Sequence, residues 1–374
     1  MEKENFIQVK KNNLNQKKSV LQFIGFIKYI SLLIIIRVHI HSHDKELFYA
    51  IRACELLFVS SGFLVGYNYV DREIPNTFYY AFMYYYKHLK TCYPLYLINF
   101  LYGVFSHRQQ IKLDLTSIEL FLINIFMLQI WSRHRTIVSF YNGISWFLHD
   151  LLICYFLAPL LLNGIKSIKT SLIFFITFSI TRIMLDEFIK RGALNIFDAH
   201  IHDGPIVRVF EFYLGMLTIP TFIKIKCYLD KCRNDFQFKV IFSIIPILTT
   251  IIVYYILSKI YFHLLCCYYV LIFCIYIFII GYEYGYLSYI ITNNVIKTIM
   301  NPQMEMYLSH VSINRIIERN KMMNFLLNRM NKEMVFFIKL IIIFSLSSLY
   351  KKLFKERFSY FMDKSLLKLK KIIF

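Results

Sequence analysis

The chain has 374 residues, of which 57% are hydrophobic and 18% are charged. A soluble fold of this length cannot bury so much apolar surface, so part of that surface must face lipid. The formal net charge is +20. The basic residues lie in short stretches between apolar runs, which is typical of membrane proteins and argues against a nucleic-acid partner. Anionic lipid headgroups are the simplest partner for these residues.

The apolar runs predict a series of membrane-spanning helices. Residues 1–18 are polar and basic, which predicts a cytoplasmic N-terminus. Spans are then expected at 19–38, 47–70, 91–107, 144–163, 170–186, 206–224, 238–258, 260–281 and 334–351. The aromatic, Lys-containing stretch 71–90 is typical of an amphipathic segment at the cytoplasmic interface.

Two further segments are harder to assign. Residues 117–131 are short for a span of ~20 residues, and residues 303–320 contain Arg315, Glu318 and Arg319, whose charges are costly in lipid. The basic stretches 71–90, 164–169 and 224–239 belong on the cytoplasmic side. All of these stretches lie on the cytoplasmic side if 117–131 is re-entrant or interfacial and 303–320 crosses the membrane.

These assignments predict an all-α fold, a polytopic membrane helical bundle with about ten transmembrane helices. We divide the chain into a basic cytoplasmic N-terminus at 1–18, a membrane domain at 19–351 and a basic C-terminal tail at 352–374. Both termini are expected in the cytoplasm.

Two ionisable residues stand out in the first apolar run. Lys28 and His39 are eleven residues apart, which places them on one helix face, roughly 16 Å apart along the axis. Ionisable groups inside a membrane usually face a bundle interior or a cavity and are candidates for function. We therefore expect both side chains to point into a shared cavity. The simpler alternative is that Lys28 reaches the headgroups and His39 begins a loop.

The second run contains a cluster of small residues. Ser60, Ser61, Gly62 and Gly66 interrupt its apolar residues, which predicts close approach of another helix. Ordinary helix packing explains this segment equally well.

Six segments combine polar, small and aromatic residues at fixed spacing. They are Lys28 with His39; Leu57, Phe58, Ser61, Gly62, Phe63 and Leu64; Lys87, Lys90, Pro94 and Tyr96; Trp146, Leu148, Tyr155 and Pro159; Arg208, Glu211, Phe212 and Gly215; and Tyr307, Leu308 and His310. In type and order these segments resemble the motifs of the acyltransferase type 3 family of multi-span membrane enzymes. The likeness covers roughly residues 20–350 and depends on the order of the six segments.

The resemblance implies a membrane O-acyltransferase of the plasma (inner) membrane. Such an enzyme moves an acyl group, commonly acetyl from acetyl-CoA as co-substrate, to a hydroxyl of a surface polysaccharide or lipid-linked glycan. His39 suits the general base, or a transient acyl carrier. The remaining expected site residues are Lys28 and Ser61 as stabilisers of the thioester oxygen, His310 and Glu211 as further catalytic candidates, and Lys87, Lys90 and Arg208 as donor-phosphate ligands.

Two departures from the family pattern leave an inactive relative as one alternative. Lys28 stands where the family has Arg, which removes the bidentate fork and keeps the charge. Gln303 stands where the late helix usually has Ser. A transporter or flippase of lipid-linked sugars is a second alternative, although the sequence shows no repeated halves.

A metal site is the least favoured interpretation. Alternating His39, His41 and His43, with Asp44, converge only on an extended segment, and His200, His202 and Asp203 form a smaller cluster. We expect no metal cofactor. The pattern of residues does not specify the acceptor sugar or the length of the acyl chain, because both depend on pocket shape.

Overall fold

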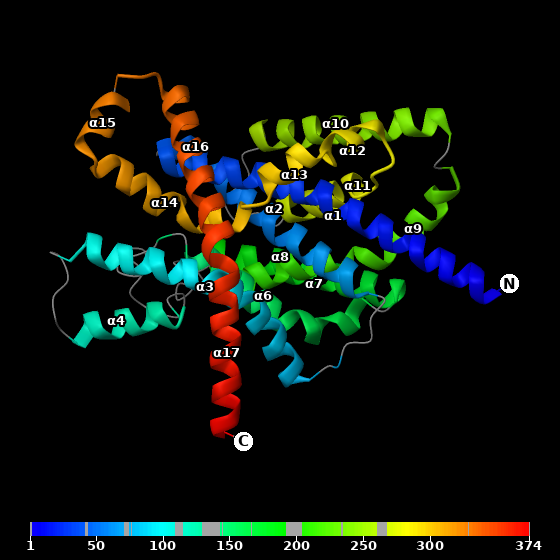
Figure 1. The fold of residues 1–374 in the computed structure, drawn as a ribbon. Helices are drawn as coiled ribbons and strands as arrows, with labels where there is room; N and C mark the ends of the chain where they lie inside the picture. The colour runs from blue at the N-terminus through cyan, green and yellow to red at the C-terminus, as the bar shows by residue number, and fades with distance from the viewer. Residues whose placement is uncertain are drawn as a thin grey trace.

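The computed structural model is built of helices (Figure 1). It describes residues 2–41, 44–70, 75, 77–108, 115–128, 143, 145–165, 167–191, 204–232, 235–259, 268–327 and 329–373, and this part of the chain contains no strand. The all-helical prediction is therefore confirmed. The first nine labelled helices are α1 (Glu2–His41), α2 (Asp44–Tyr69), α3 (Phe78–Ser106), α4 (Leu115–Ile125), α6 (Ser145–Leu161), α7 (Ile168–Lys190), α8 (Pro205–Leu217), α9 (Ile219–Leu229) and α10 (Phe236–Lys259).

The C-terminal third continues as short helices followed by two long ones. They are α11 (Tyr268–Ile280), α12 (Tyr286–Ile291), α13 (Asn294–Met300), α14 (Gln303–Arg319), α15 (Lys321–Leu327), α16 (Lys332–Tyr350) and α17 (Glu356–Ile373). Single-turn 3-10 segments follow α6 and α9, and a π-helical turn at Lys351–Lys355 joins α16 to α17.

Six helical segments of the described chain are long and apolar enough to cross a membrane. They are Gln22–His41, Leu47–Tyr69, Ile168–Leu185, Pro205–Cys232, Phe236–Lys259 and Lys332–Lys364. Two shorter apolar helices, α6 and α11, add to them. The predicted count of about ten spans is not reproduced on this criterion. Of the two segments that the sequence left ambiguous, α4 has 11 residues and is too short for a full span, whereas α14 has 17 and lies at the lower limit of the length range for a span.

Helix α3 differs most from its predicted boundaries. It begins at Phe78 and runs unbroken to Ser106, with Pro94 inside it. The stretch expected to lie at the interface and the span expected from residue 91 therefore form one helix. The side chain of Thr77 accepts a hydrogen bond from the Tyr80 amide at its start, which satisfies one of the unpaired donors of the first turn.

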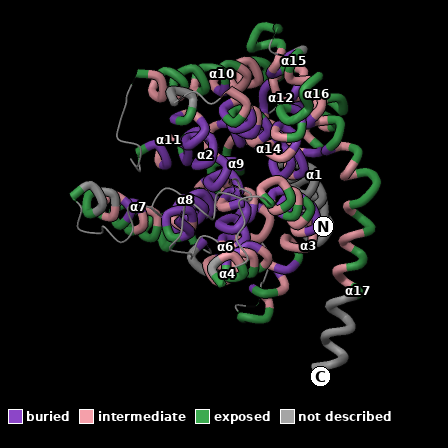
Figure 2. The backbone as a smooth tube through the Cα atoms, turned by 90° about the vertical axis from the view of Figure 1, so that its left-hand side faces the viewer, coloured by how far each residue is buried: buried purple, intermediate pink, exposed green. Residues whose placement is uncertain are grey.

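Helix α2 lies at the centre of the bundle and packs closely on α8. Figure 2 shows buried residues along both helices, whereas α10 is largely exposed. A Cβ atom added to Gly62 would lie 1.8 Å from the Phe212 carbonyl oxygen, and one added to Gly215 would lie 2.1 Å from that of Val59. The small-residue prediction for this segment is confirmed, because the two backbones touch where side chains are absent.

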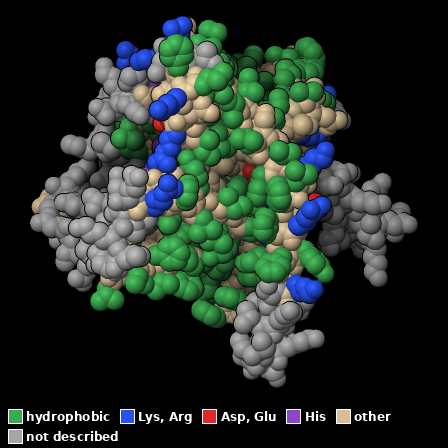
Figure 3. Space-filling model, turned by 60° about the vertical axis from the view of Figure 1, so that its left-hand side comes forward, with side chains coloured by type: hydrophobic (Ala, Val, Ile, Leu, Met, Phe, Trp, Pro, Cys, Tyr) green, Lys and Arg blue, Asp and Glu red, His purple; other side chains and the backbone are tan. Residues whose placement is uncertain are grey.

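The outer surface carries the apolar residues that the core does not bury. Figure 3 shows a face covered mainly by hydrophobic side chains, with Lys and Arg gathered toward its margins. On α10, for example, Ile244, Ile251 and Ile252 are each about half exposed. A surface of this kind is stable against hydrocarbon and not against water.

Candidate functional site

Helix α1 directs Lys28 and His39 to different neighbours on the same side of the bundle. Eleven residues of helix rotate by about 20° beyond three full turns, so both side chains leave the same face. Lys28 reaches α2 and His39 reaches α14. The simpler alternative placed Lys28 at the headgroups and His39 at the start of a loop, whereas here Lys28 bonds Ser61 and His39 lies within α1 with an exposed side chain.

The Lys28 ammonium ends in a small polar site made by three other helices. Its Nζ donates a hydrogen bond to Ser61 Oγ at 2.9 Å, and Ser61 Oγ donates to the Leu57 carbonyl at 2.6 Å. The side chain of Tyr155 on α6 lies beside Ser61. The ring of His88 on α3 stacks on Tyr155 with centroids 3.9 Å apart. Four helices thus position one cation.

The second site is a contact between two histidines that are 271 residues apart. His310 Nε2 lies 3.2 Å from His39 Nδ1. His310 Nδ1 lies 2.7 Å from the Tyr307 carbonyl, and His39 Nδ1 lies 2.9 Å from the Ile35 carbonyl. Carbonyl oxygens only accept, so each neutral ring carries its proton on Nδ1. His310 Nε2 then accepts from His39 Nδ1–H.

This arrangement leaves the other nitrogen of His39 as a lone-pair donor. Within the part of the chain that the structure describes, His39 Nε2 makes no hydrogen bond. His39 is exposed and His310 is buried. A neutral imidazole with an accessible, unprotonated nitrogen has the chemistry of a general base.

Arg208 and Glu211 form a buried ion pair on α8. Arg208 Nη1 lies 2.7 and 2.8 Å from the two Glu211 carboxylate oxygens, and both side chains are almost completely buried. A second buried pair, Arg52 with Glu55 on α2, has an N–O distance of 2.7 Å. The prediction that Arg208 and Glu211 pair is confirmed. Buried charges remain ionised only when they are paired and hydrogen-bonded.

Aromatic rings connect the Arg208 pair with the histidine pair. The guanidinium of Arg208 lies 5.4 Å from the Phe58 ring centroid. Phe58 contacts Phe147 at 4.8 Å, Phe147 contacts Tyr307 at 4.9 Å, and Tyr307 contacts His310 at 5.8 Å between centroids. Side chains from α2, α6, α8 and α14 are therefore packed in one continuous series.

The two lysines predicted to bind donor phosphates both lie on α3. Lys87 is exposed on α3. Lys90 is bound to Asp363 on α17, with N–O distances of 2.7 and 3.0 Å. Lys90 therefore holds the C-terminal helix against α3, which a basic motif by itself does not indicate.

Several buried residues of the bundle have no counterpart in the six sequence motifs. His88 stacks beside the Lys28 site, and Arg52, Asp150 and Arg182 are buried in the bundle. Each of these three charges interrupts an apolar run, which was an available signal for a residue facing the protein interior.

No group of three metal-ligating side chains occurs among the described residues. His43, His200, His202 and Asp203 of the predicted clusters lie outside them.

A cavity of about 750 Å³ lies beside α1 on the face opposite Lys28 and His39. Its α1 lining includes Phe26, Ile30 and Arg37, which are rotated by about 140–180° from the two ionisable residues. It is therefore not the shared cavity that the sequence predicted.

Comparison with known proteins gives no relative, because no protein-family model, curated protein or solved structure matches the chain.

Proposed function

We propose that the protein is a membrane O-acyltransferase that moves an acyl group, with acetyl favoured, from acyl-CoA to a hydroxyl of a surface or lipid-linked glycan. The observation that carries the proposal is the contact between His39 and His310. His39 belongs to the first of the six sequence motifs and His310 to the last. A contact between them is expected of a shared site and not of two unrelated packing residues.

His39 acts as the base in this proposal. Its Nε2 takes the proton from the acceptor hydroxyl as the hydroxyl oxygen bonds to the thioester carbonyl carbon. The carbon–sulfur bond then breaks, and the proton passes to the departing thiolate. When His39 is protonated, its Nδ1–H becomes a charged donor to Ile35 and His310, and charged donors make stronger hydrogen bonds. His310 is a positioning residue that fixes the tautomer and ring orientation of His39.

Lys28 and Ser61 serve the donor rather than the reacting carbonyl. They lie about three helical turns, roughly 16 Å, from His39 along α1, which is too far to contact the same oxygen. The Lys28 ammonium, held by Ser61 and beside His88, suits a phosphate at the other end of an extended thioester. The ion pair of Arg208 and Glu211 has a structural role in this proposal, because the Arg208 guanidinium packs on Phe58, the first ring of the aromatic series.

The membrane arrangement is part of the same proposal. Ten spans, with both termini in the cytoplasm of a plasma (inner) membrane, place the N-terminal half of α1 and the Lys28 site toward the cytoplasmic supply of acyl-CoA. His39 then lies toward the outer side, where a glycan hydroxyl is available.

The decisive experiment compares two histidine variants in a strain that lacks the native gene. Surface and lipid-linked glycans are analysed for ester groups by mass spectrometry. We expect His39→Ala to abolish ester formation. His107→Ala is the matched control, because His107 Nδ1 also bonds a carbonyl four residues earlier, at 2.9 Å, but lies at the end of α3. Normal ester content with His39→Ala present in the membrane would refute the proposal.

A further inference from the structure

The cavity on the far side of α1 is an open groove between two helices. Most of its lining residues come from α1 and α10, and the rest come from α2, α11, α12 and α13; Ala53 and Phe273 are among the buried ones and Ile30 and Ile251 among the exposed ones. We call the lining residues of α1 and those of α10 the two walls of the groove. A molecule dissolved in the surrounding hydrocarbon can enter such a groove sideways.

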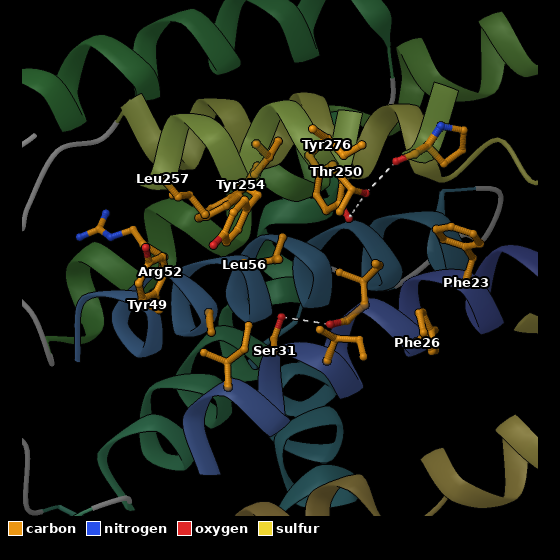
Figure 4. A pocket seen from close by; sticks show the side chains of 18 of the residues that line it. Phe23, Phe26, Ser31, Tyr49, Arg52, Leu56, Thr250, Tyr254, Leu257 and Tyr276 are labelled. Carbon is orange, nitrogen blue, oxygen red and sulfur yellow. Dashed lines mark hydrogen bonds between the residues drawn. The ribbon is translucent and has the colours of Figure 1, made fainter. Parts of the chain in front are cut away.

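The charged lining residues of the groove are Arg37 on α1 and Arg52 on α2. Figure 4 shows Arg52 and Tyr49 at one end, with Phe23 and Phe26 at the other. Arg37 also lines the groove and belongs to the last turns of α1. Tyr and Arg side chains are typical of the depth at which lipid headgroups lie.

The hydroxyl groups along the middle of the groove are already satisfied by the protein. Ser31 donates to the Ile27 carbonyl at 3.0 Å, and Thr250 donates to the Pro246 carbonyl at 2.7 Å. They offer little to a polar ligand. The middle of the groove is therefore suited to hydrocarbon.

The cation at the polar end is able to exchange its partner. Arg37 makes a bidentate contact with Glu333 at 2.7 and 2.9 Å, and both side chains are substantially exposed, at 40% and 53%. Exposed ion pairs contribute little stability. A phosphate can bind the planar Arg37 guanidinium through two oxygens, in the same way as the Glu333 carboxylate does.

We propose that this groove binds one phosphate-bearing glycerophospholipid, with an acyl chain between α1 and α10 and the phosphate at Arg37. An amphiphile has the same polarity profile as the lining. The acyl chain of the lipid also makes dispersion contacts with the lining residues of both walls. The site is separate from the histidine pair, which lies on the opposite face of α1, and the proposal does not depend on the acyltransferase function.

The test measures lipid retained by the purified full-length protein. Detergent-solubilised protein is equilibrated with micelles containing equal amounts of dioleoylphosphatidylglycerol and dioleoylglycerol, and bound lipid is quantified by mass spectrometry after gel filtration. We expect the phosphate-bearing lipid to be preferred about tenfold. Ile251→Trp fills the groove and should lower retention severalfold. Ile252→Trp is the matched control, because Ile252 is equally exposed on α10 and does not line the groove.

Arg37→Gln should remove the preference for the phosphate while the chain still binds. If Ile251→Trp does not give monodisperse protein, Ile247→Trp, on the same wall, replaces it. Equal retention by the groove variant and Ile252→Trp would overturn the site. Equal retention of the two lipids by the unmodified protein would overturn the phosphate assignment. Displacement of phosphatidylglycerol by an equal amount of polyprenyl phosphate would overturn the choice of a glycerophospholipid.

Discussion

Replacing His310 separates a positioning role from a catalytic one. His310→Phe keeps a ring of similar size and removes the nitrogen that accepts from His39 Nδ1–H at 3.2 Å. His39 retains the Ile35 carbonyl as a second acceptor at 2.9 Å. The loss is therefore one shared neutral hydrogen bond, worth about 1 kcal/mol, and not the base itself.

The corresponding change in kcat is about fivefold to tenfold, because 1.4 kcal/mol corresponds to a factor of ten. Loss of the base in His39→Ala should cost about 10²–10⁴. His310→Gln, whose amide oxygen accepts in place of Nε2, should recover part of the activity.

The assay follows thiol release from acetyl-CoA by the detergent-purified protein in the presence of glycan acceptor. The KM for acetyl-CoA should stay unchanged in His310→Phe, because the proposed donor site lies near Lys28. A loss in His310→Phe as large as that in His39→Ala would refute the reasoning and make His310 a reacting group. No loss at all would refute the positioning role.

Three further pairs of variants test the packing and the charges. Gly62→Ala should destabilise the protein by at least about 2 kcal/mol, because the new Cβ meets a backbone oxygen; Gly25→Ala, which meets nothing within 4 Å, is the control, and thermal unfolding in detergent compares them. Glu211→Gln leaves a buried guanidinium without its carboxylate and should cost about 3–5 kcal/mol in the same assay, whereas Glu333→Gln, in an exposed pair, should have little effect. Lys28→Arg should keep the KM for acetyl-CoA and Lys28→Met should raise it about tenfold; equal values would show that the charge is irrelevant.

The sequence alone predicted the features that depend on local geometry. Apolar runs indicated helices, and the spacing of Lys28 and His39 placed them on one face because the helical repeat is fixed. The buried pair of Arg208 and Glu211 followed in the same way, since residues three apart are neighbours on a helix. Small residues in α2 likewise indicated a close helix crossing, and Gly62 lies at that crossing.

Helix boundaries were predicted less well where two signals competed. The Tyr- and Lys-rich stretch before residue 91 has the composition of an interface, which indicates a position outside the span. In the structure it continues α3, because Tyr84 and Tyr86 are buried and buried residues recur along the helix from Ala81 to Gly103. Pro94 does not end the helix either. Tertiary packing outweighed both local signals.

Only the tertiary structure decided which distant residues meet. His39 and His310 are brought together by the packing of α1 against α14, and Lys90 is taken by Asp363 of the last helix. Contacts of this kind depend on how helices cross, and the sequence of one helix does not encode the register of another. The same reason explains the groove beside α1. The sequence showed that Phe23, Phe26 and Ile30 are apolar, but whether they face a neighbouring helix or an open groove depends on where α10 lies.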